Sequence, residues 1–336
     1  MKRIIECVPN FSEGIDETII NAIAHEIAGV TSVKLLNVDP GKSANRTVMT
    51  FAGEPQGVIE AAYLAIKKAG ELIDMRTQTG EHPRMGATDV CPLIPISNIT
   101  IEETVVYANR LAKRVGEELG VPVYLYEYSQ PDKNRSNLSI IREGEYEGFF
   151  TKIKQPGWQP DFGPAEMNAK SGATVIGARD LLVAYNITLN TKSVKIAHQI
   201  AQDVRESGRM ERDADGNKKQ IPGTLKKVKA IGWYMEQYGK AQVSMNLTDI
   251  NITPFHIAFE EVCNKAAAYN VKVTGSELIG MIPLKAMLDA GKYFSGKQLL
   301  SINVIESELI ETAIKYMGLD ELSPFEPYKR IIEYQL

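Results

Sequence analysis

Cysteine is scarce in this sequence, and its spacing argues against two common ways of stabilising a small domain. The 336 residues include three cysteines, Cys7, Cys91 and Cys263. They are odd in number, lie far apart and form no CxxC pair, so we expect neither a disulfide framework nor a structural zinc site. We interpret them as buried thiols.

Long apolar runs and basic clusters are also missing. No apolar stretch approaches the ~20 residues of a membrane span, and residues 1–14 lack the apolar length and the cleavage site of a secretory signal. The sequence therefore predicts a cytoplasmic protein without a membrane segment. The formal net charge is −4, and no basic residues alternate with aromatic ones, which argues against nucleic acid as a partner. A small-molecule ligand is favoured.

Motifs for nucleotides and catalytic metals are absent. No GxGxxG follows a strand-like run, and no GxxxxGK[ST], HExxH or paired-histidine spacing occurs. The glycines of GATVIGAR (172–179) have the wrong spacing to cradle a phosphate. We therefore expect no nucleotide cofactor and no metal. Cys91 follows a loop histidine, His82, but the strand-like context beside Pro92 favours a buried thiol over a nucleophile.

The sequence is long enough for two hydrophobic cores, and its apolar pattern repeats. The strand-like run DVCPLIPI (89–96) contains Pro92 and Pro95. It is expected to be an edge strand, because proline cannot donate a hydrogen bond to a neighbouring strand. The first half reads β-α-β-β-α-β, followed by one more helix and strand, and the order β-α-β-β-α returns in the second half. The expected elements are 3–11, 15–27, 33–39, 47–53, 55–73, 89–96, 101–119 and 122–128, then 180–189, 192–207, 225–235, 241–247 and 254–269.

Split β-α-β units of this kind predict an α+β protein with two ferredoxin-like subdomains, each an antiparallel sheet with helices on one face. We place the subdomains at 1–180 and 181–336. The stretch 143–180 is rich in glycine and proline and too long for a simple connection, so we expect it to be functional. The charged stretch 205–223 lacks apolar anchors and is expected to be a mobile surface loop.

One of the four histidines stands out. His25 and His198 lie in ordinary amphipathic segments, and His256 follows Pro254 at an expected helix start. His82 instead lies in RTQTGEHPRMGATD (76–89), a loop of the kind in which catalytic groups concentrate, and its imidazole can exchange a proton near neutral pH.

Polar residues at the strand ends could converge on this loop, or they could serve only to turn the chain. The sequence leaves both readings open. The residues concerned are Asn10, Ser12, Asp39, Ser43, Asn45, Arg46 and Asp89.

Several long, collinear segments resemble glutamate formimidoyltransferase, the formiminotransferase part of the formiminotransferase-cyclodeaminase family. The likeness covers essentially the whole chain, and in animal members a cyclodeaminase domain would follow near its end. The segments are ECVPNFSEG (6–14), NVDPGKSANRTVMTFAG (37–53), GEHPRMGATDVCPLIPI (80–96), VPVYLYEY (121–128), DFGPAEMNAKSGATVIGAR (161–179) and IGWYMEQYGKAQVSMNL (231–247).

The resemblance implies a homodimer whose protomers hold folate in a groove between two subdomains. It implies that His82 is the catalytic acid/base and that tetrahydrofolate, a co-substrate, binds a segment from Gly163 to Gly172. The segment consists of Gly163, Pro164, Ala165, Glu166, Met167, Asn168, Ala169, Lys170, Ser171 and Gly172.

The implied reaction moves the formimino group of N-formimino-L-glutamate to N5 of tetrahydrofolate, a step of histidine degradation and one-carbon metabolism. From loop position we predict that Asp39 holds the amidinium of the donor and that Arg46 holds a carboxylate. Two alternatives stay open: the same acceptor with N-formyl-glutamate or formimino-glycine as donor, and a folate-binding protein without chemistry.

Overall fold

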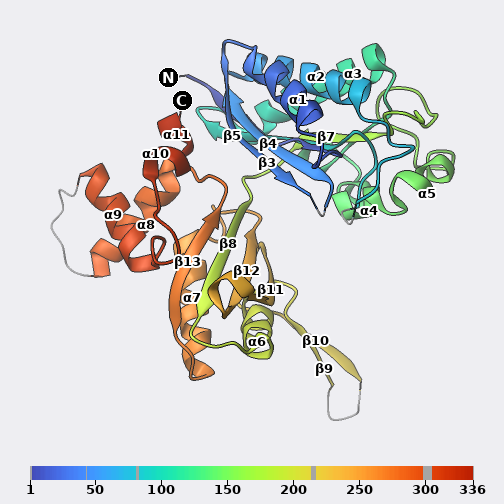
Figure 1. Ribbon diagram of the computed structural model, residues 1–336. Coiled ribbons are helices and arrows are strands. Elements are labelled where there is room, and N and C mark those ends of the chain that lie inside the picture. The colour runs from blue at the N-terminus through green and yellow to red at the C-terminus, as the bar shows by residue number, and fades with distance from the viewer. Residues whose placement is uncertain (1, 43, 81–82, 213–216, 298–304, 336) are drawn as a thin grey trace. The chain divides into compact units, whose positions relative to one another are not determined.

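The computed structural model describes residues 2–42, 44–80, 83–212, 217–297 and 305–335 (Figure 1). The chain divides into two compact units, Met1–Asp180 and Leu181–Gln335. Each unit has a hydrophobic core of its own. Both combine β-sheets with α-helices, so the predicted α+β class is confirmed. Among the described residues, no helix combines the length and the apolar character needed to cross a membrane.

The first unit is built around one mixed sheet. Across the sheet the order is β3, β4, then β1 and β2 in line, then β5, β7 and β6. The pairs on the β3 side of β5 are antiparallel, whereas β7 runs parallel to both β5 and β6. The strands are β1 (Ile4–Cys7), β2 (Asn10–Phe11), β3 (Val33–Gly41), β4 (Arg46–Gly53), β5 (Thr88–Ser97), β6 (Val123–Leu125) and β7 (Thr174–Ala178).

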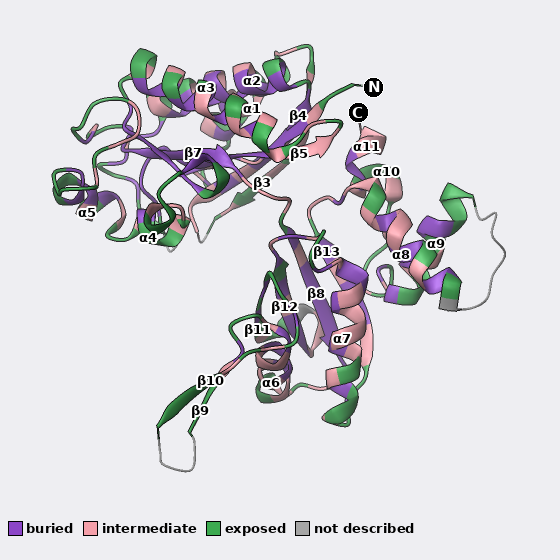
Figure 2. Cartoon of the chain, turned by 180° about the vertical axis from the view of Figure 1, so that it is seen from behind, coloured by how far each residue is buried: buried purple, intermediate pink, exposed green. Residues whose placement is uncertain are grey.

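Helices cover both sides of this sheet. Three long helices run along one face, and two shorter ones lie on the opposite side (Figures 1 and 2). The long helices are α1 (Glu17–Ala28), α2 (Pro55–Leu72) and α3 (Ile101–Leu119), and the short ones are α4 (Leu138–Arg142) and α5 (Glu145–Lys152).

Local sequence explains where the long helices begin. Asp16 caps α1 by accepting a hydrogen bond from the backbone N–H of Thr18. Pro55 occupies the first turn of α2, where its missing N–H costs nothing. Thr100 and Glu103 form a reciprocal capping box at the start of α3.

The prediction that 89–96 forms an edge strand is wrong, because β5 has paired strands on both sides. The carbonyl of Pro92 accepts a hydrogen bond from the N–H of Val8, which lies in the break between β1 and β2. The N–H and C=O of a strand residue point to the same side, so the missing donor of Pro92 faces this break. Proline is tolerated inside a sheet at such an irregularity.

The stretch 143–180 is more regular than its composition suggested. It contains α5 and the strand β7, and all five residues of β7 are buried. The glycine-containing run GATVIGAR therefore includes an interior strand of the sheet. Periodicity could not reveal β7, since a strand buried on both faces does not alternate.

The second unit contains a four-stranded antiparallel sheet in the order β11-β12-β8-β13. Helix α6 packs on β11 and β12, and α7 packs on β8. The element β13 completes the repeated pattern and was not among the expected strands. The elements are β8 (Val183–Leu189), α6 (Val194–Val204), β11 (Val228–Met235), β12 (Lys240–Leu247), α7 (Phe255–Ala268), β13 (Val273–Ile279), α8 (Leu284–Lys297), α9 (Glu306–Met317), α10 (Pro327–Arg330) and α11 (Ile332–Gln335).

The stretch 205–223, predicted to be a mobile surface loop, contains a hairpin. Strands β9 (Arg209–Arg212) and β10 (Lys218–Ile221) pair in antiparallel fashion, and their side chains are mostly exposed (Figure 2). The backbone ladder holds the pair together, and Gln220 adds a side-chain bond to the carbonyl of Ser207. A hairpin of this kind needs no apolar face, which is why hydrophobic periodicity missed it.

Candidate functional site

The loop 76–89 enters from α2 and leads into β5 in the first unit. Residues 81 and 82 lie outside the described residues, so His82, the predicted acid/base, is not part of the geometry that follows. The residues on both sides of it are described.

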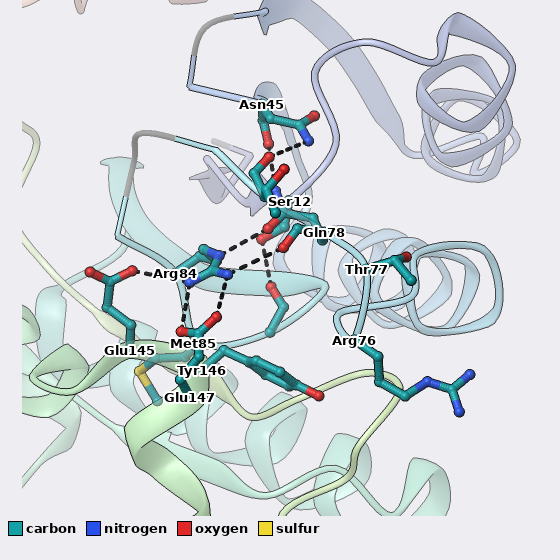
Figure 3. A network of polar contacts seen from close by, with 12 residues as sticks. Ser12, Asn45, Arg76, Thr77, Gln78, Arg84, Met85, Glu145, Tyr146 and Glu147 are labelled. Atoms are coloured by element: carbon teal, nitrogen blue, oxygen red, sulfur yellow. Dashed lines mark hydrogen bonds and ion pairs between the residues drawn. The ribbon is translucent and has the colours of Figure 1, made fainter.

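A buried guanidinium joins the two arms of this loop to α5 (Figure 3). Arg84, which is 8% exposed, donates from Nε to Gln78 Oε1 (2.9 Å) and from Nη2 to the carbonyl of Gln78 (3.2 Å). Its two Nη atoms also form a fork on Glu147 at 2.9 and 2.7 Å, and Nη1 reaches Glu145 at 3.1 Å. The bond to Glu147 raises the pKa of Arg84 and lowers the pKa of the Glu147 carboxyl. We call the bonds of Arg84 to Gln78, Glu145 and Glu147 the Arg84 clamp. Gln78 precedes His82 in the chain and Arg84 follows it, so the clamp joins the residues on both sides of the predicted catalytic position.

Two of the predicted strand-end residues hold the same loop from the other side (Figure 3). Asn45 accepts from the N–H of Gly14 at 2.9 Å and donates to the carbonyl of Thr79 at 2.7 Å. The hydroxyl of Ser12 donates to the carbonyl of Gly86 at 2.7 Å. Asn45 also adopts a left-handed φ of 44°, so it turns the chain as well. Asn45 therefore contacts the loop and also turns the chain, so both interpretations of the strand-end residues apply to it.

The predicted folate segment, 163–172, ends directly against the loop. The carbonyl of Ser171 accepts from the N–H of Ala87 at 2.8 Å, and the carbonyl of Lys170 accepts from Met75 at 2.9 Å. Its first four residues are exposed, whereas Met167, Ser171 and Gly172 are buried. The sequence placed these two segments 74 or more positions apart, and the tertiary structure joins them by backbone hydrogen bonds.

Gly86 lies where the backbones of these segments approach closely. A Cβ at this position would lie 2.3 Å from the carbonyl oxygen of Ala173 and 2.6 Å from that of Ser171. We expect Gly86→Ala to lower the free energy of unfolding by about 1–3 kcal/mol, since backbone on both sides would have to move apart. Thermal melting measures the effect. Gly148→Ala is the matched control, because nothing lies within 4 Å of the added carbon and alanine favours the helix α5. Equal melting temperatures for the two variants would contradict this account.

Asp89 lies at a bulge in the ladder between β2 and β5. Asn10 pairs with Val90 and Phe11 with Thr88, so Asp89 is the extra residue of β5. Bulges change the direction of a side chain and often occur beside active sites. The carboxylate is fully buried and accepts from the N–H of Met85 (3.0 Å) and from Arg142 Nη2 (2.5 Å). Burial raises the pKa of Asp89, against the opposing effect of Arg142, Met85 and Arg46.

Asp39 and Arg46 lie on the same face of the sheet as each other. Asp39 pairs with Val48 across β3 and β4, and Arg46 precedes Val48 by two residues, so all three side chains share one face. Asp39 is exposed and Arg46 is half-buried. Burial lowers the pKa of Arg46, and the charges of Asp89 and Asp39 act in the opposite direction. Arg46 therefore belongs to the electrostatic surroundings of Asp89.

Arg142 and Lys152 are residues of this region that the sequence analysis did not identify. Arg142 ends α4, a helix of five residues that is too short to show periodicity. The ammonium of Lys152, 8% exposed, donates to the carbonyls of Ile140, Ile141 and Glu143 at 2.8–2.9 Å. It also lies 3.9 Å from the ring centroid of Trp158. Lys152 thus fixes the end of the helix that carries Arg142.

Replacing Lys152 with methionine tests this role. The variant keeps the length of the side chain but leaves the three carbonyls without their donor, so we expect a loss of about 1–3 kcal/mol in the free energy of unfolding. Chemical denaturation provides the measurement. Lys154→Met removes the same charge from an exposed position two residues away and is expected to stay within about 0.5 kcal/mol of the wild type. The account fails if both variants unfold at the same denaturant concentration.

The remaining candidate groups are cysteine and histidine side chains outside the loop 76–89. Cys7 and Cys91 are fully buried, as predicted, with their sulfurs 3.5 Å apart, and burial raises the pKa of Cys7. Cys263 is only partly buried, so the prediction of a buried thiol is not met there. His256 is buried in α7 beside aromatic rings, and burial lowers its pKa. Within the described ranges, no three His, Cys, Asp or Glu side chains are grouped so as to hold a metal ion.

Comparison with known proteins assigns both halves of the chain to one family. The family profile for the N-terminal subdomain of the formiminotransferase domain matches residues 4–179, and the profile for the formiminotransferase domain matches 184–336. The chain is 49% identical to the formimidoyltransferase-cyclodeaminase of Gallus gallus over 99% of its length, and it spans 60% of that relative.

Shorter relatives are covered almost completely. The chain is 40% identical to the glutamate formimidoyltransferase of Streptococcus pyogenes serotype M1, with 88% of this chain and 94% of that relative aligned. For the glutamate formimidoyltransferase of Thermoplasma acidophilum the identity is 42%, with 87% and 92% aligned. From these matches over both units, the chain belongs to the formiminotransferase family.

Proposed function

We propose that this chain transfers the formimino group of N-formimino-L-glutamate to N5 of tetrahydrofolate, giving 5-formiminotetrahydrofolate and L-glutamate. The names of the relatives covered over more than 90% of their length support this reaction. The observation that carries it is the backbone pairing of residues 85–87 with residues 171–173, because the reaction needs its acid/base and its folate close together in a fixed geometry.

The roles of the residues follow the chemistry. N5 attacks the formimino carbon, a tetrahedral intermediate forms, and the C–N bond to glutamate breaks as the electron pair returns to the leaving nitrogen. His82 removes the proton from N5 and delivers it to that nitrogen. Asp39 holds the amidinium of the donor, Arg46 holds a carboxylate, and residues 163–172 hold tetrahydrofolate, with no metal involved.

The wider architecture is also part of the proposal. We infer that both units are ferredoxin-like, that folate lies in a groove between them, and that the chain acts as a cytoplasmic homodimer whose other partners are small molecules. In the second unit, βαββαβ connectivity with strands in the order 2-3-1-4 supports the ferredoxin-like assignment. In the first unit, β1 to β5 follow the same order before β7 and β6 are added.

The test is a coupled assay of the purified chain with tetrahydrofolate and each of three donors, following the one-carbon folate spectroscopically. We expect turnover with formimino-glutamate to exceed turnover with formyl-glutamate or formimino-glycine. If another donor is preferred, the proposed donor is wrong and tetrahydrofolate remains the acceptor. Tight folate binding without turnover of any donor would overturn the proposal in favour of a folate-binding protein.

A further inference from the structure

A cavity of about 490 Å³ lies beside the loop 76–89 in the first unit. Its walls include Pro83 from the loop, Ser139 and Arg142 from α4, and Glu143 and Glu145 from the turn into α5. The volume is within the range of small-molecule sites. All of these residues belong to one unit, so the cavity does not depend on the second.

Arg142 gives this cavity a guanidinium with a hydrogen-bond donor still unused. Its Nη2 donates to the buried Asp89, whereas its Nε is buried and has no acceptor among the described residues. Arg46 also acts electrostatically on Asp89. The Nε–H of Arg142 therefore remains a buried donor, and a carboxylate of an anionic ligand would satisfy it.

The position of Arg142 is set before any ligand arrives. Lys152 holds three carbonyls at the end of α4, and the Arg84 fork holds Glu145 and Glu147 at the start of α5. Gly144 between the two helices has a left-handed φ of 91°, which a glycine adopts without strain. A guanidinium held in this way loses little freedom on binding a carboxylate.

The lining also restricts the ligand to a class. The guanidinium suits a carboxylate, and Glu143 and Glu145 suit a cationic nitrogen on the same small molecule. The formimino donor combines these features, since it carries an amidine and two carboxylates.

We propose that Arg142 binds a carboxylate of the formimino donor in this cavity and thereby contributes to donor specificity. The inference rests on the proposed function and deepens it, because it adds a second arginine to the donor site. Arg142 touches substrate in this scheme, whereas Lys152 acts as a positioning residue through α4.

The experiment must separate substrate binding from the structural pairing of Arg142 with Asp89. Arg142→Gln alone leaves a buried carboxylate without its partner and could unfold the unit. The double variant Asp89→Asn/Arg142→Gln removes both charges, and the asparagine can still accept from the N–H of Met85. Asp89→Asn alone is its reference. Arg110→Gln, an exposed arginine on α3, is the control for loss of one positive charge.

We expect the double variant to raise KM for the donor by about 10- to 100-fold over Asp89→Asn, with KM for tetrahydrofolate changed less than about twofold. Binding of the product L-glutamate, measured by calorimetry, should weaken by the same factor. Arg142→Lys should raise the donor KM by an intermediate factor, because the charge remains and the planar guanidinium is gone. Equal donor KM in the double variant and in Asp89→Asn would overturn the proposal. An equal rise in KM for the donor and for tetrahydrofolate would overturn it as well.

Failure of the proposed function would be recognised separately. If the wild type turns over none of the donors, calorimetry with L-glutamate still decides the inference. Binding by the wild type that is lost in the double variant supports a carboxylate site at Arg142. Absence of L-glutamate binding by the wild type contradicts it.

Discussion

Replacing His82 with alanine is expected to lower turnover of formimino-glutamate by ~10²–10⁴-fold, the usual contribution of a general acid/base. The reaction requires one proton to leave N5 and one to reach the departing nitrogen, and the variant has no group at this position to move them. Binding of tetrahydrofolate should persist, because the folate segment is a different part of the chain. The coupled assay gives the rate, and fluorescence or calorimetric titration gives the folate affinity.

The pH profile makes this prediction more specific. A general base acts in its neutral form, so the wild-type kcat/KM should fall as the pH falls and the imidazole takes up a proton, and the variant should lose this dependence. His25→Ala is the control, since His25 is exposed on α1. Turnover by His82→Ala within a few-fold of the wild type would show that the proton transfers belong to another group.

Replacing Arg84 with methionine is expected to lower kcat by about 10²-fold although Arg84 itself moves no proton. The guanidinium makes five hydrogen bonds that tie both arms of the loop to one another and to α5. Without them the loop is no longer held in one position, and a displacement of about 1 Å can cost this much. The unit should remain folded, because Glu145 and Glu147 are exposed enough to be hydrated. Steady-state kinetics and thermal melting separate the two effects.

Two further variants complete the test of Arg84. Arg76 lies in the same loop, points away from the Arg84 network in Figure 3 and is 61% exposed, so Arg76→Met should behave like the wild type. Arg84→Lys keeps the charge but cannot form the fork on Glu147, and its rate should fall between the two. If Arg84→Met and Arg76→Met have the same kcat, the clamp does not position the loop.

Features set by nearby residues could be predicted from the sequence. The caps and apolar stripes of α1, α2 and α3 identified these helices, because a helix forms from contacts three and four residues apart. The composition of 76–89 predicted a functional loop for the same reason: glycine, proline and a titratable residue occur together within it. The resemblance to a family supplied the remaining assignments, including the folate segment.

Pairing between distant segments could not be predicted in this way. Strand β7 is inserted beside β5, and Pro92 faces a break between two other strands; neither fact follows from the residues around it. The hairpin 209–221 likewise depends on backbone pairing that leaves no apolar pattern.

The sequence by itself determined two units of α+β structure, a titratable histidine in a loop and the lack of a metal motif, and it predicted the proposed chemistry and a separate folate segment. Only the tertiary structure decided which groups support that chemistry. Arg84 meets Glu147 across 63 residues, and Asp89 meets Arg142 across 53. The physical reason is that a buried charge is stable only beside a partner, and folding alone brings such partners together from distant parts of the chain.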